Sequence, residues 1–304
     1  MLEIAVIGLR WLEYSGAVVL FGVPFFLLHS FRDWDAPNLT WARPTLIVAS
    51  IVVAVGSLVA LVAQTAVMAG SLTEALKPAS LSFMVTGTTL GLAMVIRVAV
   101  ALTALFALAV FGQGRSLWRV TAVTGLVIVA SFAWTGHGAA TAGPGGLIHL
   151  GADVIHAVAA ALWLGALAAL LALLLRRVGP EDPAIHRALH GFAGLGTVAV
   201  VLLTASGLVN SWFLVGPTRI VELGTSLYGQ LLIAKLALFV LMLALASANR
   251  FHLTPALGTV IAGGDDSRSE LQRLKNSVLV ETTVGLILLG LVAVMGTLAP
   301  PAAM

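Results

Sequence analysis

Long apolar runs constrain this chain more than any other feature of its sequence. They recur along its whole length, and short polar or Gly/Pro-containing breaks separate them. A helix that crosses the hydrocarbon core of a bilayer needs about 20 apolar residues. The runs predict eight membrane-spanning helices, near residues 4–29, 44–66, 81–111, 118–135, 147–175, 191–214, 227–248 and 275–298.

Composition supports a bilayer protein with an all-α fold. The chain is 60% hydrophobic and 10% charged, whereas soluble domains carry roughly 25% charged residues. The runs also lack the alternation of apolar and polar residues that an outer-membrane β-barrel needs. We therefore expect a polytopic helical bundle, one transmembrane domain over residues 1–304, whose partner is the lipid bilayer and not nucleic acid. The first run has no basic flank before it and no cleavage site after it, so we expect a retained helix.

The distribution of Lys and Arg predicts the orientation. Loops on the cytoplasmic side of a membrane protein carry an excess of these residues. The loops after the first, third, fifth and seventh runs hold 11 of them: Arg32, Arg43, Arg115, Arg119, Arg176, Arg177, Arg187, Arg250, Arg268, Arg273 and Lys275. The other side holds only Lys77 and Arg219. We expect both termini outside, and residues 249–274 to form a flexible cytoplasmic connector.

Six charged residues lie within the predicted spans: Arg10, Glu13, Arg97, Asp153, Lys235 and Glu281. A charge in hydrocarbon is costly unless it is paired or hydrated, so such residues mark interior contacts or functional paths. Four of these residues lie nearer the outer ends of the helices, where the cations Arg10 and Lys235 can balance the carboxylates of Glu13 and Asp153. Nearer the centre, we expect Arg97 to balance Glu281. Structural pairs and a hydrated polar path both fit this network.

One face of the 147–175 helix carries a dense set of metal-ligating side chains. His149, Asp153 and His156 are spaced i, i+4, i+7, which confines them to an arc of roughly 60°. A carboxylate beside a ligating imidazole can fix its tautomer. His137 lies in the glycine-rich segment 134–138 before this helix, on the same outer side. These four residues predict a metal site at the outer end.

The absence of cysteine narrows the choice of metal ligands. With no thiolate available, histidine, methionine and carboxylate remain. Thioethers suit Cu(I), and imidazole suits copper in general. Three methionines fall near the outer ends of predicted helices, although each also fits ordinary packing: Met68, Met84 and Met295.

Small residues predict close helix contacts at two places. Gly87 and Gly91 are four residues apart, as are Ala161 and Gly165. This spacing lets two helix backbones approach each other closely in a membrane.

An ordered series of segments in the second half resembles the copper resistance protein D (CopD) family. The segments are His149 through Asp153-Val154-Ile155-His156 to Trp163-Leu164-Gly165, then Thr204-Ala205-Ser206-Gly207 with Asn210, Tyr228-Gly229 with Lys235, Ala248-Asn249-Arg250, Leu253-Thr254-Pro255, and Glu281 followed by Gly296 to Pro301. The resemblance implies an eight-helix protein of the bacterial plasma (inner) membrane that moves copper ions, usually inward. It also implies a periplasmic copper-binding partner of the CopC type. The family's aspartate and histidine positions in the fifth helix correspond to Asp153 and His156.

The leading hypothesis is a copper permease and not an enzyme. No GxxxxGK[ST] motif is present, so we do not expect ATP to drive this chain directly. A haem b electron-transfer bundle is the alternative, with axial pairs from His137 and His156 or from His29 and a cytoplasmic-side histidine. A third hypothesis is a copper-sensing partner subunit without flux.

Overall fold

The structure, a computed structural model, describes residues 2–31, 39–176, 183–263 and 267–303. Over these ranges the chain is helical without a β-strand, and eight helices are long and apolar enough to cross a membrane. The predicted fold class and the number of spans are therefore confirmed. The spanning helices are α1 (Leu2–Ser30), α2 (Ala42–Ala69), α5 (Thr89–Val110), α6 (Arg115–Ser131), α7 (Gly145–Arg176), α8 (Pro183–Leu214), α10 (Leu227–Ala248) and α12 (Arg268–Met295).

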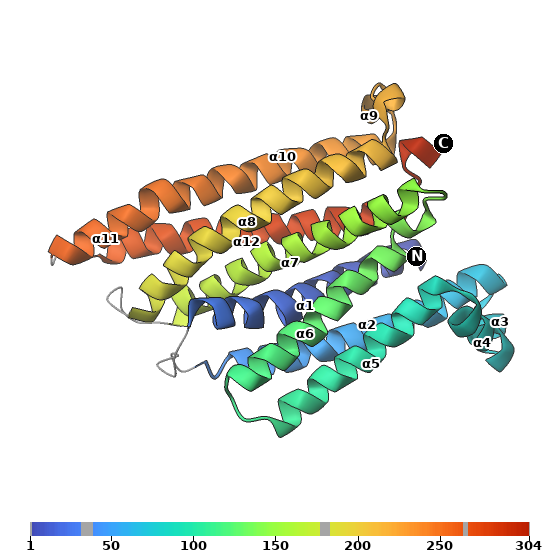
Figure 1. The fold of residues 1–304 in the computed structure, drawn as a ribbon, viewed down its shortest axis with the longest axis horizontal. Helices are drawn as coiled ribbons and strands as arrows, with labels where there is room; N and C mark the ends of the chain where they lie inside the picture. Colours follow the sequence, from blue (N-terminus) through green and yellow to red (C-terminus); the bar gives the residue numbers. More distant parts are fainter. Residues whose placement is uncertain (1, 32–38, 177–182, 264–266, 304) are drawn as a thin grey trace.

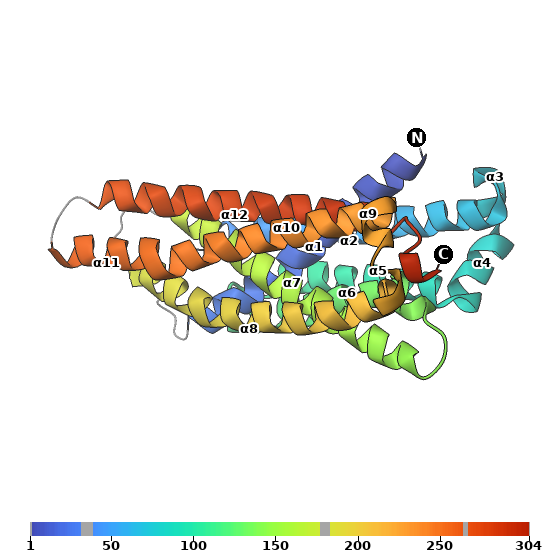
Figure 2. The same ribbon diagram turned by 90° about the horizontal axis from the view of Figure 1, so that it is seen from above.

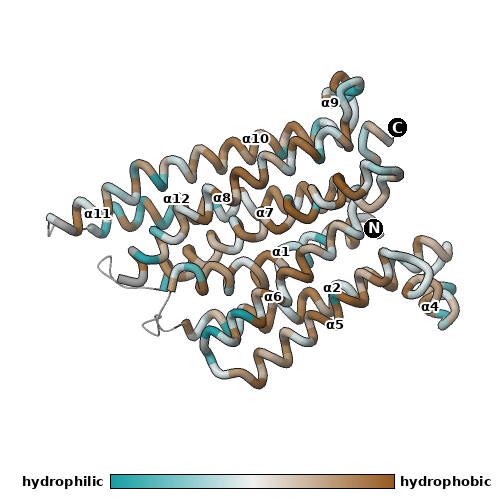
Figure 3. The backbone as a smooth tube through the Cα atoms, in the orientation of Figure 1, coloured by the Kyte–Doolittle hydropathy of each residue, from teal (hydrophilic) through white to brown (hydrophobic). Residues whose placement is uncertain are grey.

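Short helices connect the spans at both ends of the bundle. They are α3 (Leu72–Ala75), α4 (Pro78–Gly87), the 3-10 turns η1 (Phe132–Thr135) and η2 (Gly138–Ala140), α9 (Glu222–Thr225) and α11 (Thr254–Gly263). The long helices run lengthwise through the molecule in both views (Figures 1 and 2). Hydrophobic residues dominate the middle of these helices, and many hydrophilic ones lie toward the two ends (Figure 3). This distribution fits a bundle that spans a bilayer.

The spans form two groups of four helices. In the first half of the chain, α1 packs on α2 and α6, and α5 packs on both of those helices. In the second half, α7 packs on α8 and α12, and α10 packs on α12. The groups meet mainly where α1 lies along α7, near the middle of Figure 1.

The backbones of α1 and α7 touch each other directly because glycine residues lie at their contact. A Cβ atom on Gly22 would overlap the carbonyl oxygen of Ala161, and one on Gly165 would overlap the Cα atom of Gly22. No larger residue fits without moving a helix. The small-residue spacing of Ala161 and Gly165 thus lies at the junction of the two groups, as expected for close packing.

The predicted helix at 81–111 is in fact two helices. Thr88 is extended, with φ −134° and ψ 141°, and it separates α4 from α5. Its hydroxyl accepts a hydrogen bond from the amide of Gly91 at 3.0 Å and donates to the carbonyl of Met84 at 2.7 Å. The side chain of Thr88 thus caps the start of α5.

The expected flexible connector at 249–274 is wrong over 249–263 and again from Arg268, where α12 begins, and residues 264–266 lie outside the described residues. The chain continues from α10 through a π-helix at Asn249–Leu253 into α11. Pro255 is the second residue of α11 and lies directly after the π-helix. The apolar residues after it continue the helix to Gly263.

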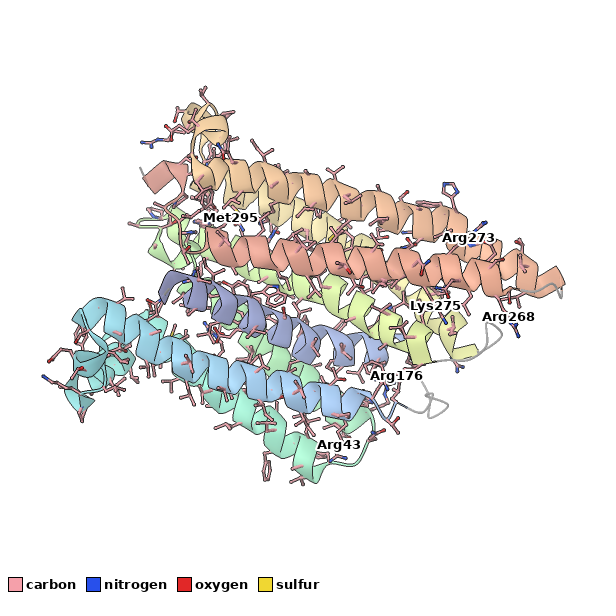
Figure 4. The ribbon with its side chains drawn as sticks, turned by 180° about the vertical axis from the view of Figure 1, so that it is seen from behind. Arg43, Arg176, Arg268, Arg273, Lys275 and Met295 are labelled. Carbon is pink, nitrogen blue, oxygen red and sulfur yellow. The ribbon has the colours of Figure 1, made fainter. Side chains whose placement is uncertain are left out.

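Both termini lie at one end of the bundle, as Figure 1 shows. Figure 4 places five labelled basic residues at the end opposite Met295: Arg43, Arg176, Arg268, Arg273 and Lys275. The two ends of the bundle therefore differ in charge as the distribution of Lys and Arg among the predicted loops suggests. Which end faces the cytoplasm stays a prediction.

Candidate functional site

Asp153 of α7 joins three segments at the end of the bundle that carries the termini. Its Oδ2 atom accepts a hydrogen bond from the backbone amide of Gly138 in η2 at 3.0 Å. Its Oδ1 atom accepts one from the side-chain amide of Asn210 in α8 at 2.7 Å. A Cβ atom on Gly138 would overlap Oδ2, so glycine is required for this approach. The carboxylate thus holds the segment of His137 against α7 and α8.

His149 is buried one turn before Asp153. Its Nδ1 atom lies 2.7 Å from the hydroxyl of Thr141, and its ring stacks on Phe213 with centroids 4.8 Å apart and planes 7° apart. The ring is 1% exposed. Its Nε2 atom is buried and forms no hydrogen bond with any described residue. One ring nitrogen is therefore fixed and the other is available.

His137 has the same unusual feature. Its Nε2 atom is also buried without a hydrogen bond to the part of the chain that the structure describes. Its ring meets that of Tyr228 edge to face, with centroids 6.1 Å apart. Buried polar atoms are rarely left without a partner, because each costs on the order of 1–3 kcal/mol. Two unpartnered imidazole nitrogens therefore point to a ligand.

We name His137, His149, Asp153 and Asn210 the histidine cluster. Both histidines act electrostatically on Asp153, as does Lys235 of α10. The Oδ1 atom of Asn210 is likewise buried and unpartnered among the described residues. Among the described residues, no group of three His, Asp or Glu side chains is close enough together to hold one metal ion.

His156 lies two turns beyond His149 on the same face of α7, and its tautomer follows from its contacts. Its Nδ1 atom is 3.0 Å from the hydroxyl of Ser206 in α8, and that hydroxyl donates to the carbonyl of Leu202 at 2.6 Å. Since Ser206 has one proton to give, it accepts from Nδ1–H. The Nε2 atom of His156 then carries the lone pair that a metal needs.

The three methionines lie in three different helices of the structure. Met68 lies at the end of α2 and is 59% exposed. Met84 is buried in α4, where its sulfur contacts the hydroxyl of Thr88 at 3.3 Å. The corner of α3 and α4 packs on α2 and α5 and lies away from α9 in Figure 1. Met295 is buried at the end of α12. A role of these methionines in metal binding stays a prediction.

The expected pairing of Arg97 with Glu281 is wrong. Arg97 forms a buried salt bridge with Glu13 of α1 at 3.6 Å instead. The reason is helix order, because α5 packs within the first group of helices and α12 within the second. The hydroxyl of Ser57 donates a second hydrogen bond to Glu13 at 2.5 Å.

Arg97 also holds the turn that precedes His137. It donates hydrogen bonds to the hydroxyl of Ser131 at 2.8 Å and to that of Thr135 at 3.1 Å. Its guanidinium lies 4.1 Å from the ring centroid of Phe132. The buried salt bridge is therefore linked through η1 to the histidine cluster.

A small cavity lies beside this salt bridge. Its volume is about 20 Å³, and a water molecule needs roughly 10–15 Å³ on this scale. The polar part of its wall consists of Arg10, Glu13, Tyr14, Gln64, Arg97 and Thr135. The first group of helices thus contains room for water at a charged site.

Glu281 is fully buried in α12 and has two neutral partners. Its Oε1 atom accepts a hydrogen bond from the indole N–H of Trp163 at 3.2 Å, and its Oε2 atom accepts one from the amide of Asn249 at 2.9 Å. No salt bridge to Glu281 is found among the described residues.

Several partners in these sites do not follow from the spacing of histidines and charges. Asn210 and Ser206 are polar residues inside an apolar run, which is the signal that could have identified them. Asn249 directly follows such a run. Thr141 lies in a loop and gives no such signal. The contact of Tyr228 with His137 depends on how α10 lies beside η2.

Comparisons with known proteins identify copper resistance proteins as similar to this chain. A family model described as copper resistance protein D-like, N-terminal domain, matches residues 1–147, and one described as copper resistance protein D matches residues 186–295. The chain is 37% identical over 308 aligned residues to copper resistance protein D of Pseudomonas syringae pv. tomato, covering 97% of this chain and 96% of that protein.

Two further relatives are more distant. Inner membrane protein YebZ of Escherichia coli (strain K12) is 28% identical over 62% of each chain. Copper transport protein CutJ of Bacillus subtilis (strain 168) is 29% identical over 45% of this chain and 25% of its own. No solved structure gives a significant match. Nothing in these comparisons or in the contacts of His156 supports the haem alternative.

Proposed function

Because the chain belongs to the copper resistance protein D family, we propose that it transports copper ions across the bacterial plasma membrane and admits them at the histidine cluster. A role in copper handling follows from the family. The site, the direction and transport itself are the proposal.

The observation that carries the proposal is the pair of buried, unpartnered Nε2 atoms of His137 and His149. Imidazole is a ligand that copper accepts in proteins. Asp153 fixes the backbone directly after His137 and lies one turn after His149 in α7, so it can orient both histidines without itself binding metal. The cluster can therefore take up a cation at small structural cost.

A path leads from the cluster along α7. His156 follows His149 by seven residues, about 10 Å along the helix axis, and its free nitrogen offers a second binding point. Lys235 acts electrostatically on His156, so a cation needs the nearby carboxylate of Asp153 to offset that charge. Successive weak sites allow an ion to arrive and leave.

We propose inward transport, with both termini and the histidine cluster outside. The basic residues at the opposite end of the bundle support this orientation (Figure 4). A separate periplasmic copper-binding protein of the CopC type would then deliver copper to the cluster.

The test is copper binding and uptake by His137→Phe and His149→Phe variants. Phenylalanine keeps an aromatic ring for Tyr228 or Phe213 but removes both ring nitrogens. We expect each variant to bind copper at least about tenfold more weakly and to lose uptake at equal protein level in the membrane. His252→Phe, at an exposed residue of the π-helix, serves as the matched control and should behave as wild type.

The same experiment separates the rival functions. Unchanged uptake in both cluster variants would refute the proposed site. Copper binding by wild type without flux in proteoliposomes would favour the sensing subunit. A Soret band in purified wild-type protein would favour the haem protein.

A further inference from the structure

Glu281 is a buried carboxyl group that the proposed copper site does not use. It is 0% exposed, and its hydrogen-bond partners, Trp163 and Asn249, are both uncharged. An isolated carboxylate is costly in such surroundings, and a protonated one is far less so. The position therefore suits a group that can take up a proton.

Asn249 can serve both protonation states of this carboxyl group. Its NH2 group donates to Oε2, and its own Oδ1 atom is buried without a hydrogen bond to any described residue. If the amide turns over, Oδ1 accepts a hydrogen bond from a protonated Oε2. Asn249 opens a π-helix, a local geometry frequently found at functional sites. The hydrogen bond thus persists whether or not the proton is present.

Trp163 links Glu281 to the face of α7 that carries the histidines. It follows His156 by seven residues and His149 by fourteen, so all three lie on nearly the same side of the helix. Its indole N–H donates to Oε1 of Glu281. The carboxyl group therefore lies further along the stripe that begins at the histidine cluster.

We propose that Glu281 is a proton-binding site that holds one proton when α7 carries no copper and releases it as copper passes. This inference rests on the proposed copper path. In the step, the O–H bond at Oε2 breaks, its electron pair stays on the oxygen, and water accepts the proton. Nothing is oxidised or reduced. The NH2 group of Asn249 then donates to the carboxylate.

The charged groups of the helices around Glu281 determine which cation can control its protonation, and we assign that role to copper. On α7 and α10, the titratable groups on the side of its partners are His156 and Lys235, and on the π-helix they are Arg250 and His252, which is exposed. Arg250 bonds to Thr197 and to the carbonyl of Ala193 in α8. On α1, Glu13 pairs with Arg97, and Arg10 lines the cavity beside them. On α12 itself, the adjoining charge is Lys275, six residues away.

A cation at His156 is near enough to matter. The axial offset from His156 to Trp163 is about 10 Å. The indole of Trp163 contacts Glu281. At an effective dielectric constant of about 20, a unit charge about 10 Å from a carboxyl group changes its protonation equilibrium on the order of tenfold. The arriving charge and the departing proton offset each other, so the interior gains little net charge.

Infrared difference spectroscopy on the whole protein in lipid vesicles tests this proposal. A protonated carboxyl group has a carbonyl stretch separate from those of carboxylates and backbone amides. We expect added copper to remove such a band from wild type. The loss should be absent in Glu281→Gln, in which the amide reproduces the shape and hydrogen bonding of the protonated acid. Glu74→Gln, at an exposed carboxyl group, should retain the wild-type response.

A second variant guards against a folding defect in the first. Asn249→Leu keeps the carboxyl group but removes its partner at Oε2, so the band should move in frequency. A copper response that is missing from wild type, or that neither variant at this site changes, overturns the proposal. Copper flux is measured separately in the same vesicles, so failure of copper transport and failure of proton release are told apart.

Discussion

Replacing Arg97 with methionine is expected to remove most of the folded protein from the membrane. The change leaves the carboxylate of Glu13 buried without its cation, and it also removes the donors to Ser131 and Thr135. Breaking a buried ion pair from one side costs about 3–5 kcal/mol, a large share of a stability of about 5–15 kcal/mol. The amount of protein in the membrane and its thermal midpoint in detergent measure the effect.

The matched control is the double variant Glu13→Leu with Arg97→Met. It removes both charges together, and replacing a buried pair by apolar residues is often close to neutral. We expect it to recover much of the lost stability. A single variant as stable as the double one would show that the ion pair does not hold the first group of helices together.

Replacing Asp153 with asparagine is expected to lower copper affinity by about 100-fold, at the upper end of what partners of metal ligands contribute. The carboxylate accepts from two N–H donors, the amide of Gly138 and the side chain of Asn210. Asparagine has one oxygen and no charge. Its oxygen can accept from the amide of Gly138 only if its NH2 group faces Asn210, whose own amide must then turn over to accept. The cluster also loses the negative charge that offsets a bound cation.

Titration of purified protein with copper measures this loss, and the thermal midpoint shows whether the fold survives. Thr141→Val is the useful comparison, because it removes a hydroxyl from the same region but leaves both unpartnered nitrogens in place. Its affinity should stay within a few-fold of wild type. If Asp153→Asn binds copper as tightly as wild type does, the carboxylate has no part in positioning the histidines.

The sequence predicts the spans well and the neighbours of each buried charge poorly. Apolar runs identify all eight spans because lipid demands about 20 apolar residues in each. The i, i+4, i+7 spacing places His149, Asp153 and His156 on one face because the helix period is fixed. Glu281 was expected to balance Arg97 because the predicted helix 81–111 put Arg97 near its middle. In the structure α5 begins at Thr89, so Arg97 lies only eight residues from the start of its span, and α5 and α12 belong to different groups of helices.

The candidate methionines show the same limit. Met68 and Met84 share the depth of the histidines, but they lie at a corner built by α2 to α5. The helix boundaries are also hard to foresee, because hydropathy does not register a cap such as the Thr88 hydroxyl or a π turn at Asn249. Both depend on hydrogen bonds of single residues.

The glycine contact between α1 and α7 has a mechanical consequence. Transport requires some helices to move relative to others, but rotation or sliding of either helix here would drive side chains into the facing backbone. We therefore expect Gly22 and Gly165 to remain in contact throughout the proposed transport cycle while α8 and α10 move. Because the chain has no cysteine, two introduced cysteines can carry spin labels that report a single distance, one label on α1 and the other on α7. A change in that distance when copper is added would show that these two helices move relative to each other.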